Sequence, residues 1–128
     1  MLFRSLPTLL SYVGLEKPAK LPGRDYAAAL RGEKAEWDDT VYYEFDNTRA
    51  IRTREWKLVR RHPEGPDELY DLAKDPDERV NLARDGSSAE RREGLNQRLQ
   101  DFFARHADPK YDLWKGGVSK VRRPLAGP

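Results

Sequence analysis

Basic side chains gather in one short stretch of the sequence, where their types and spacing could bind an anion. Arginine matches sulfate or phosphate oxygens with two parallel hydrogen bonds. We therefore predict an anion-binding or substrate-entrance surface formed by Arg49, Arg52 and Lys57. The other interpretation, which we favour because it is the commoner use of charges on strands, is that these residues only protect a sheet edge from aggregation. The whole stretch comprises Arg49, Arg52, Arg54, Lys57, Arg60 and Arg61.

Other residue types that perform chemistry are sparse. His62 and His106 lie far apart in the sequence without clustered partners, so we interpret them as a solvated loop residue and a favourable charge at a helix end. Asp38-Asp39 and Asp46-Asn47 carry oxygen ligands of the kind Ca²⁺ uses, but these residues are also ordinary in turns. The sequence has no cysteine, glycine-rich phosphate loop or serine nucleophile elbow. We therefore expect neither a catalytic constellation nor a metal site.

The basic stretch falls on segments that read as strands. Residues 40–45 are rich in β-branched and aromatic side chains, and Asp46-Asn47 is a turn signal. Residues 49–53 and 57–60 are expected to pair as a hairpin, and residues 68–72 form a further short strand.

Helices are expected on both sides of these strands. The apolar spacing in residues 6–13 and a capping box at the start of residues 87–106 predict the two longer ones. Asp25 is expected to cap a short helix over 26–31. Asp75, Pro76 and Glu78 predict one or two helical turns ending near Asn81, with Glu78 reaching back to the helix start.

This order of elements predicts an α+β fold. We expect a small antiparallel sheet of three to four strands, packed by a C-terminal amphipathic helix, with short N-terminal helices and an extended tail. Residues 1–33 would be linker helices from the end of a catalytic domain, 34–107 the subdomain itself and 108–128 the tail.

Composition limits the class of protein. The 128 residues fit one domain, yet only 38% are hydrophobic and 36% are charged, so we expect the chain to rely on a neighbouring surface. A net charge of +2 argues against nucleic acid as a partner. No apolar run is long enough to span a membrane, and the first residues lack a signal-peptide pattern, which leaves the localisation open.

Four short segments keep a fixed order along the chain. They are Pro7-Thr8-Leu9-Leu10 before Gly14, Gly23 through Leu30-Arg31-Gly32-Glu33, Arg49-Ala50-Ile51-Arg52-Thr53 before Trp56-Lys57-Leu58, and Glu68-Leu69-Tyr70-Asp71-Leu72 before Asp75-Pro76-x-Glu78-x-x-Asn81-Leu82. Together they resemble the C-terminal region of sulfatases of the arylsulfatase family, in the alkaline-phosphatase-like superfamily. The last two segments are the most specific, and the likeness covers about residues 6 to 105.

The resemblance implies a large α/β domain followed by a smaller one, with a four-stranded antiparallel sheet and a packed helix. Sulfatases hydrolyse sulfate esters with a formylglycine, made from Cys or Ser in a (C/S)-x-P-(S/A)-R motif, and a divalent cation, usually calcium. Both belong to the large domain. The segment from Ser5 to Leu9 begins like that motif but has Leu9 where arginine is needed. The resemblance therefore implies no catalytic residue, no metal ligand and no cofactor in this segment.

The leading hypothesis is a C-terminal sulfatase fragment that lacks the catalytic residues and packs its sheet and helix against a catalytic domain. Arg4 and Ser5 replace an acidic and an apolar residue usual in the family, as expected for a misassigned start or a frame-shifted remnant. Two alternatives stay open: a stand-alone module that binds polyanions or sulfated glycans, and a non-catalytic partner of a separately encoded catalytic chain. Expected partners are the catalytic domain and sulfated substrate.

Overall fold

The computed structural model describes residues 5–19, 21, 23–34 and 38–119. The chain divides into two compact units, Met1–Asp38 and Asp39–Pro128, which are considered separately. Within the described residues, no helix combines the length and apolarity needed to cross a membrane.

The first unit contains two short helices, α1 (Ser5–Tyr12) and α2 (Ala27–Leu30). Asp25 binds the start of α2 as predicted, because the amide of Ala27 donates to its carboxylate over 2.7 Å, but the helix begins one residue later than predicted and its N-cap is Tyr26. The amide of Tyr26 donates to the hydroxyl of Thr8 over 2.9 Å, which holds the start of α2 against α1.

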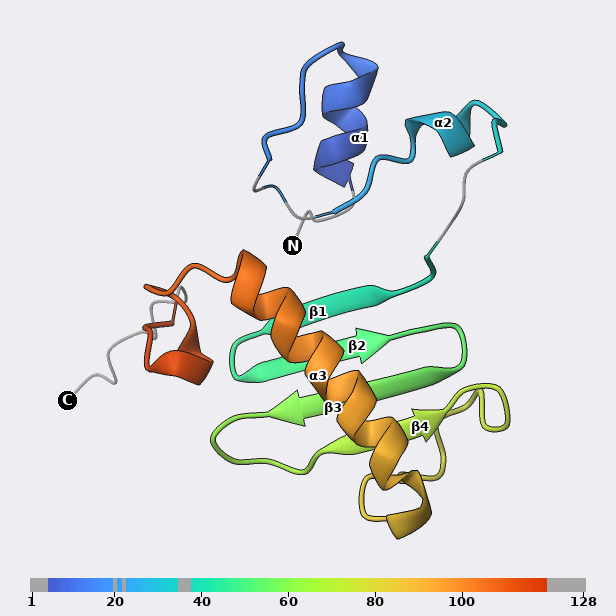
Figure 1. Ribbon diagram of the computed structural model, residues 1–128, viewed down its shortest axis with the longest axis vertical. Coiled ribbons are helices and arrows are strands. Elements are labelled where there is room, and N and C mark those ends of the chain that lie inside the picture. Colours follow the sequence, from blue (N-terminus) through green and yellow to red (C-terminus); the bar gives the residue numbers. More distant parts are fainter. Residues whose placement is uncertain (1–4, 20, 22, 35–37, 120–128) are drawn as a thin grey trace, which may run out of the picture. The chain divides into compact units, whose positions relative to one another are not determined.

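The second unit is built on a four-stranded antiparallel sheet (Figure 1). The strands lie in the order β1-β2-β3-β4, so each is a hairpin neighbour of the next. The predicted hairpin is confirmed, with Arg52 of β2 opposite Lys57 of β3. The strand bounds are Val41–Phe45 for β1, Thr48–Arg52 for β2, Trp56–Arg61 for β3 and Glu68–Asp71 for β4.

The helix α3 (Ala89–His106) crosses one face of this sheet (Figure 1). Side chains alternate between the two faces of a strand. Ile51, Leu58 and Leu69 are fully buried beneath the helix, where they meet Leu99 and Phe103. This core confirms the predicted α+β fold, in which an amphipathic helix covers one side of the sheet.

Two local predictions need correction. The segment after β4 forms turns rather than helical turns, and Glu78 takes a left-handed backbone with a φ of 55°. Its carboxylate does not reach back to cap a helix start. Residues 108–119 are less extended than expected, since they form turns and a short 3-10 helix, Leu113–Lys115. Residues 120–128 of the predicted tail lie outside the described residues.

Candidate functional site

The structure places Arg49 in the core rather than on a binding surface. The residue is only 5% exposed. Its Nε donates to the Glu44 carboxylate over 2.9 Å, and its Nη2 donates to Asp112 over 2.7 Å. The guanidinium also lies 4.1 Å from the ring centre of Phe103 and 5.1 Å from that of Trp114. This cation already has two carboxylate partners, an arrangement that does not fit the predicted role in binding an external anion.

Arg52 and Lys57 lie side by side on the face of the sheet opposite α3. Both contact the carboxylate of Glu78, with Arg52 Nη1 3.3 Å from its Oε1 and Lys57 Nζ donating to its Oε2. The left-handed turn at Glu78 brings this carboxylate over the β2–β3 pair. An external anion at Arg52 and Lys57 would have to share these cations with Glu78, and its binding there stays a prediction.

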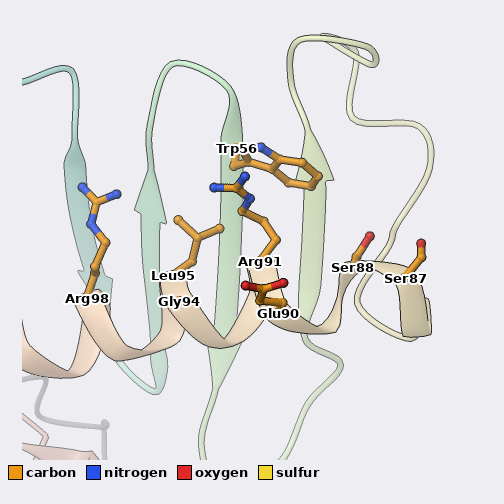
Figure 2. Close-up of a pocket in the computed structure, with 8 residues that line it drawn as sticks. All are labelled: Trp56, Ser87, Ser88, Glu90, Arg91, Gly94, Leu95 and Arg98. Atoms are coloured by element: carbon orange, nitrogen blue, oxygen red, sulfur yellow. The ribbon is translucent and has the colours of Figure 1, made fainter.

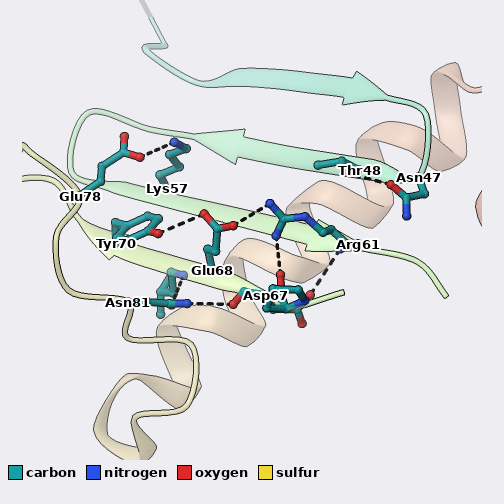
Figure 3. A network of polar contacts seen from close by, with 11 residues as sticks. Asn47, Thr48, Lys57, Arg61, Asp67, Glu68, Tyr70, Glu78 and Asn81 are labelled. Carbon is teal, nitrogen blue, oxygen red and sulfur yellow. Dashed lines mark hydrogen bonds and ion pairs between the residues drawn. The ribbon is translucent and has the colours of Figure 1, made fainter. Parts of the chain in front are cut away.

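A polar network covers the β3–β4 part of the same face (Figure 3). Glu68 accepts a hydrogen bond from the Tyr70 hydroxyl over 3.1 Å and forms an ion pair with Arg61 over 2.6 Å. Burial alone would raise the pKa of Glu68, but these two donors prevail and hold it below its ordinary value. Burial and the neighbouring Glu68 raise the pKa of Tyr70. The network therefore keeps Glu68 ionised and offers no free carboxylate for acid–base chemistry.

Asn81 fastens the loop after β4 to the edge of the sheet (Figure 3). Its side-chain oxygen accepts from the amides of Leu69, over 3.0 Å, and Ala83, over 2.9 Å. Its side-chain nitrogen donates to the carbonyl of Asp67 over 3.1 Å. Three hydrogen bonds to the main chain give this asparagine a structural role.

The β1 end of the same face is apolar and exposed. Because alternate residues of a strand share a face, Val41, Tyr43 and Phe45 all lie on the side that α3 does not cover. Tyr43 is 51% exposed and Phe45 is 66% exposed. Neighbouring aromatic side chains exposed in this way are a feature of interaction surfaces. We call Val41, Tyr43 and Phe45 the open-face patch.

A groove of about 590 Å³ runs along α3 on its sheet side (Figure 2). One helix face and Trp56, at the start of β3, provide its walls. The sequence analysis did not predict this site. Arg91 and Arg98 were a usable signal, because residues seven positions apart on a helix lie on the same face. We call it the α3 groove, and its lining includes Trp56, Ser87, Arg91, Gly94, Leu95 and Arg98.

The histidines have aromatic neighbours. The His62 ring stacks 5.1 Å from that of Trp114, and His106 lies 4.7 Å from Phe102. Of the two dipeptides considered as possible metal ligands, Asp38-Asp39 has one carboxylate, that of Asp38, in an ion pair with Arg24 over 2.7 Å. Across the described ranges, no group of three or more His, Asp or Glu side chains is placed to hold a metal ion.

Comparison with known proteins places this arrangement in a family. Residues 4–105 match the family described as N-sulphoglucosamine sulphohydrolase, C-terminal. The chain belongs to this family of sulfatase C-terminal domains. The predicted resemblance is thereby confirmed. The match includes the whole sheet and nearly all of α3, and it ends before Asp112.

Individual relatives agree with this assignment. The chain is 33% identical, over 112 residues, to a Delta 4,5-hexuronate-2-O-sulfatase of Bacteroides thetaiotaomicron, covering 80% of this chain and 23% of the relative. A solved 2-O GAG sulfatase superposes with a TM-score of 0.68 at 31% identity, covering 83% of this chain and 25% of that one. Phosphonate monoester hydrolase of Agrobacterium radiobacter gives a TM-score of 0.69 at 31% identity, over 80% and 24%. The chain therefore spans about a quarter of the length of these relatives.

Proposed function

We propose that the chain is a non-catalytic C-terminal subdomain of a sulfuric ester hydrolase, docking on a catalytic domain through the open-face patch. The observation that carries this proposal is the exposure of Tyr43 and Phe45 on a sheet whose other face is already covered by α3. Leaving two aromatic rings in water is unfavourable, and burying them at an interface would recover that free energy.

The surroundings of the patch suit such docking. Ala50 and Val59 lie beside the patch on the same face and bring no charge to it, but both are already buried, so the exposed apolar surface is limited to the patch itself. The network around Glu68 then provides a polar border on the β3–β4 side. An apolar centre with a polar border is the usual organisation of a protein interface.

In this proposal, the catalytic residues belong to the domain on which the open-face patch docks. The family's divalent cation does not fit the described residues, which bring together no cage of carboxylates. The sequence also has no cysteine, and its nearest serine motif has Leu9 in place of the required arginine. A sulfatase and a phosphonate monoester hydrolase share this subdomain, which supports placing the choice of ester in the catalytic domain.

A chimera tests the proposal. The chain replaces the C-terminal region of the Bacteroides thetaiotaomicron sulfatase, and hydrolysis of an aryl sulfate is measured with Ca²⁺ present. We expect an active chimera whose activity and unfolding temperature fall with Phe45→Asp. The matched control is Val80→Asp, since Val80 is 59% exposed on the loop after β4 and is not a residue of the patch.

Two results would reject the proposal. One is turnover by the purified 128-residue chain alone, which would show that it carries catalytic residues. The other is an equal effect of Phe45→Asp and Val80→Asp in the chimera, which would show that the open-face patch is not the docking surface. If the catalytic domain is instead a separate chain, the open-face patch would form the interface between the two polypeptides. Phe45→Asp would then weaken their association.

A further inference from the structure

The α3 groove contains two arginines, Arg91 and Arg98, that form no ion pair with any carboxylate in the part of the chain that the structure describes. Among the described residues, the guanidinium groups of Arg49, Arg52, Arg60 and Arg61 each lie within ion-pair distance of an acidic side chain. Arg91 and Arg98 have neutral partners instead. The first lies 5.4 Å from the ring centre of Trp56, and the second donates to the Thr40 hydroxyl over 2.7 Å.

These neutral partners hold the cations while leaving most of their donors available. A guanidinium that rests on an aromatic face keeps its N–H groups, which lie in its plane, free to bind an oxyanion. Arg98 uses one N–H of its five for Thr40. Both side chains are therefore oriented before any ligand binds, which lowers the entropy cost of binding.

The geometry of the groove defines the kind of ligand. Arg98 follows Arg91 by seven positions, which corresponds to about 10 Å along the helix axis. Between them lie Leu95, which is buried, and Gly94, which is exposed and whose missing side chain leaves open space. The indole of Trp56 adds an apolar wall, and Ser87 adds a hydroxyl that donates its proton to Asp85 and can still accept a hydrogen bond. Exposed Glu90 also lines the groove and offsets part of its positive charge, which disfavours an indiscriminate polyanion site.

We propose that the α3 groove binds an acidic oligosaccharide, with sulfate or carboxylate groups at Arg91 and Arg98 and the sugar ring against Trp56 and Leu95. A sugar ring offers apolar C–H faces to the indole and hydroxyls to polar neighbours, so it suits the mixed lining. The volume of about 590 Å³ is that of a small-molecule site rather than of a protein interface. This site is independent of the docking proposed above.

The test is a calorimetric titration of the 128-residue chain with a fully sulfated heparin disaccharide. We expect Arg91→Gln and Arg98→Gln each to weaken binding about tenfold or more, since each removes charge-assisted hydrogen bonds. Gly94→Gln should weaken it similarly by filling the groove without changing its charge. Arg105→Gln is the matched control, because Arg105 is exposed on the same helix outside the groove.

Two further ligands separate the parts of the proposal. The desulfated disaccharide should bind at least tenfold more weakly, and so should inorganic sulfate. Circular dichroism and the unfolding midpoint of each variant confirm that it is folded. The proposal is overturned if the wild type does not bind, if Arg105→Gln weakens binding as much as the groove variants do, or if inorganic sulfate or the desulfated sugar binds as tightly as the sulfated one.

Discussion

Replacing Arg49 by methionine should destabilise the chain more than any other arginine substitution on the sheet. The change keeps the apolar length of the side chain but removes its charge from between Glu44 and Asp112. The Asp112 side chain, 2% exposed, would then lose its cation at 2.7 Å. Breaking a buried pair on one side costs about 3–5 kcal/mol, because the remaining charge is left without compensation. Against a typical total of about 5–15 kcal/mol, such a loss is severe.

The measurement is urea unfolding followed by tryptophan fluorescence at neutral pH. Arg52→Met is the matched control, since it makes the same substitution on the same strand. The Arg52 side chain is 54% exposed and lies 3.3 Å from Glu78, so its ion pair is worth at most about 1 kcal/mol. The free energy of unfolding should therefore differ between the two variants by several kcal/mol.

A second substitution separates charge from packing. Asp112→Asn should destabilise the wild type, because it weakens the buried pair. In the Arg49→Met background the same change should stabilise the chain, because it removes the buried carboxylate left without a cation. Equal costs for Arg49→Met and Arg52→Met, or the same effect of Asp112→Asn in both backgrounds, would refute the reasoning.

Three more predictions concern stability. Gly94→Ala should raise the free energy of unfolding by about 0.5–1 kcal/mol in a thermal or urea measurement, since a Cβ there meets no atom within 4 Å; a loss would show that the glycine is needed for packing. Asn81→Ala should cost about 1–3 kcal/mol, because it leaves the amide of Leu69 without its acceptor. Gln97→Ala on the exposed side of α3 is its control and should cost less than half as much. Glu68→Gln should destabilise the chain near pH 7, and the difference from wild type should shrink as pH falls below about 4.5. The sign follows because the folded-state pKa of Glu68 is lowered, so the carboxylate stabilises the fold only where it is ionised. A pH-independent difference would contradict this.

Local patterns identified most of the fold. The β-branched and aromatic residues located β1, because that signal acts over neighbouring residues. The serines before Ala89 indicated where α3 begins, but the predicted capping box does not form: Ser88 makes no side-chain capping hydrogen bond, and Asp85 caps the preceding 3-10 turn. The turn at Glu78 was misread, since Asp75-Pro76 is also a valid start for a turn. Glu78 has a left-handed backbone, and its carboxylate forms ion pairs with Arg52 and Lys57. Both of these partners lie on strands that are distant from Glu78 in the sequence.

The candidate site was less accessible to sequence reasoning. Arg49, Arg52 and Lys57 are alike in charge and close in sequence, yet only one of them is buried. That difference depends on Asp112, which is 63 positions from Arg49 and falls in a segment expected to be extended. The α3 groove likewise joins Trp56 to a helix that begins far along the chain.

The amino-acid sequence alone determined the family, the order of the strands and helices, and the amphipathic face of α3, because these depend on short-range spacing and on motifs of neighbouring residues. Only the tertiary structure decided which arginines are neutralised, which face of the sheet stays open and where a groove forms. Those properties depend on partners that folding brings together, and the charge of a side chain says nothing about which distant carboxylate will lie beside it.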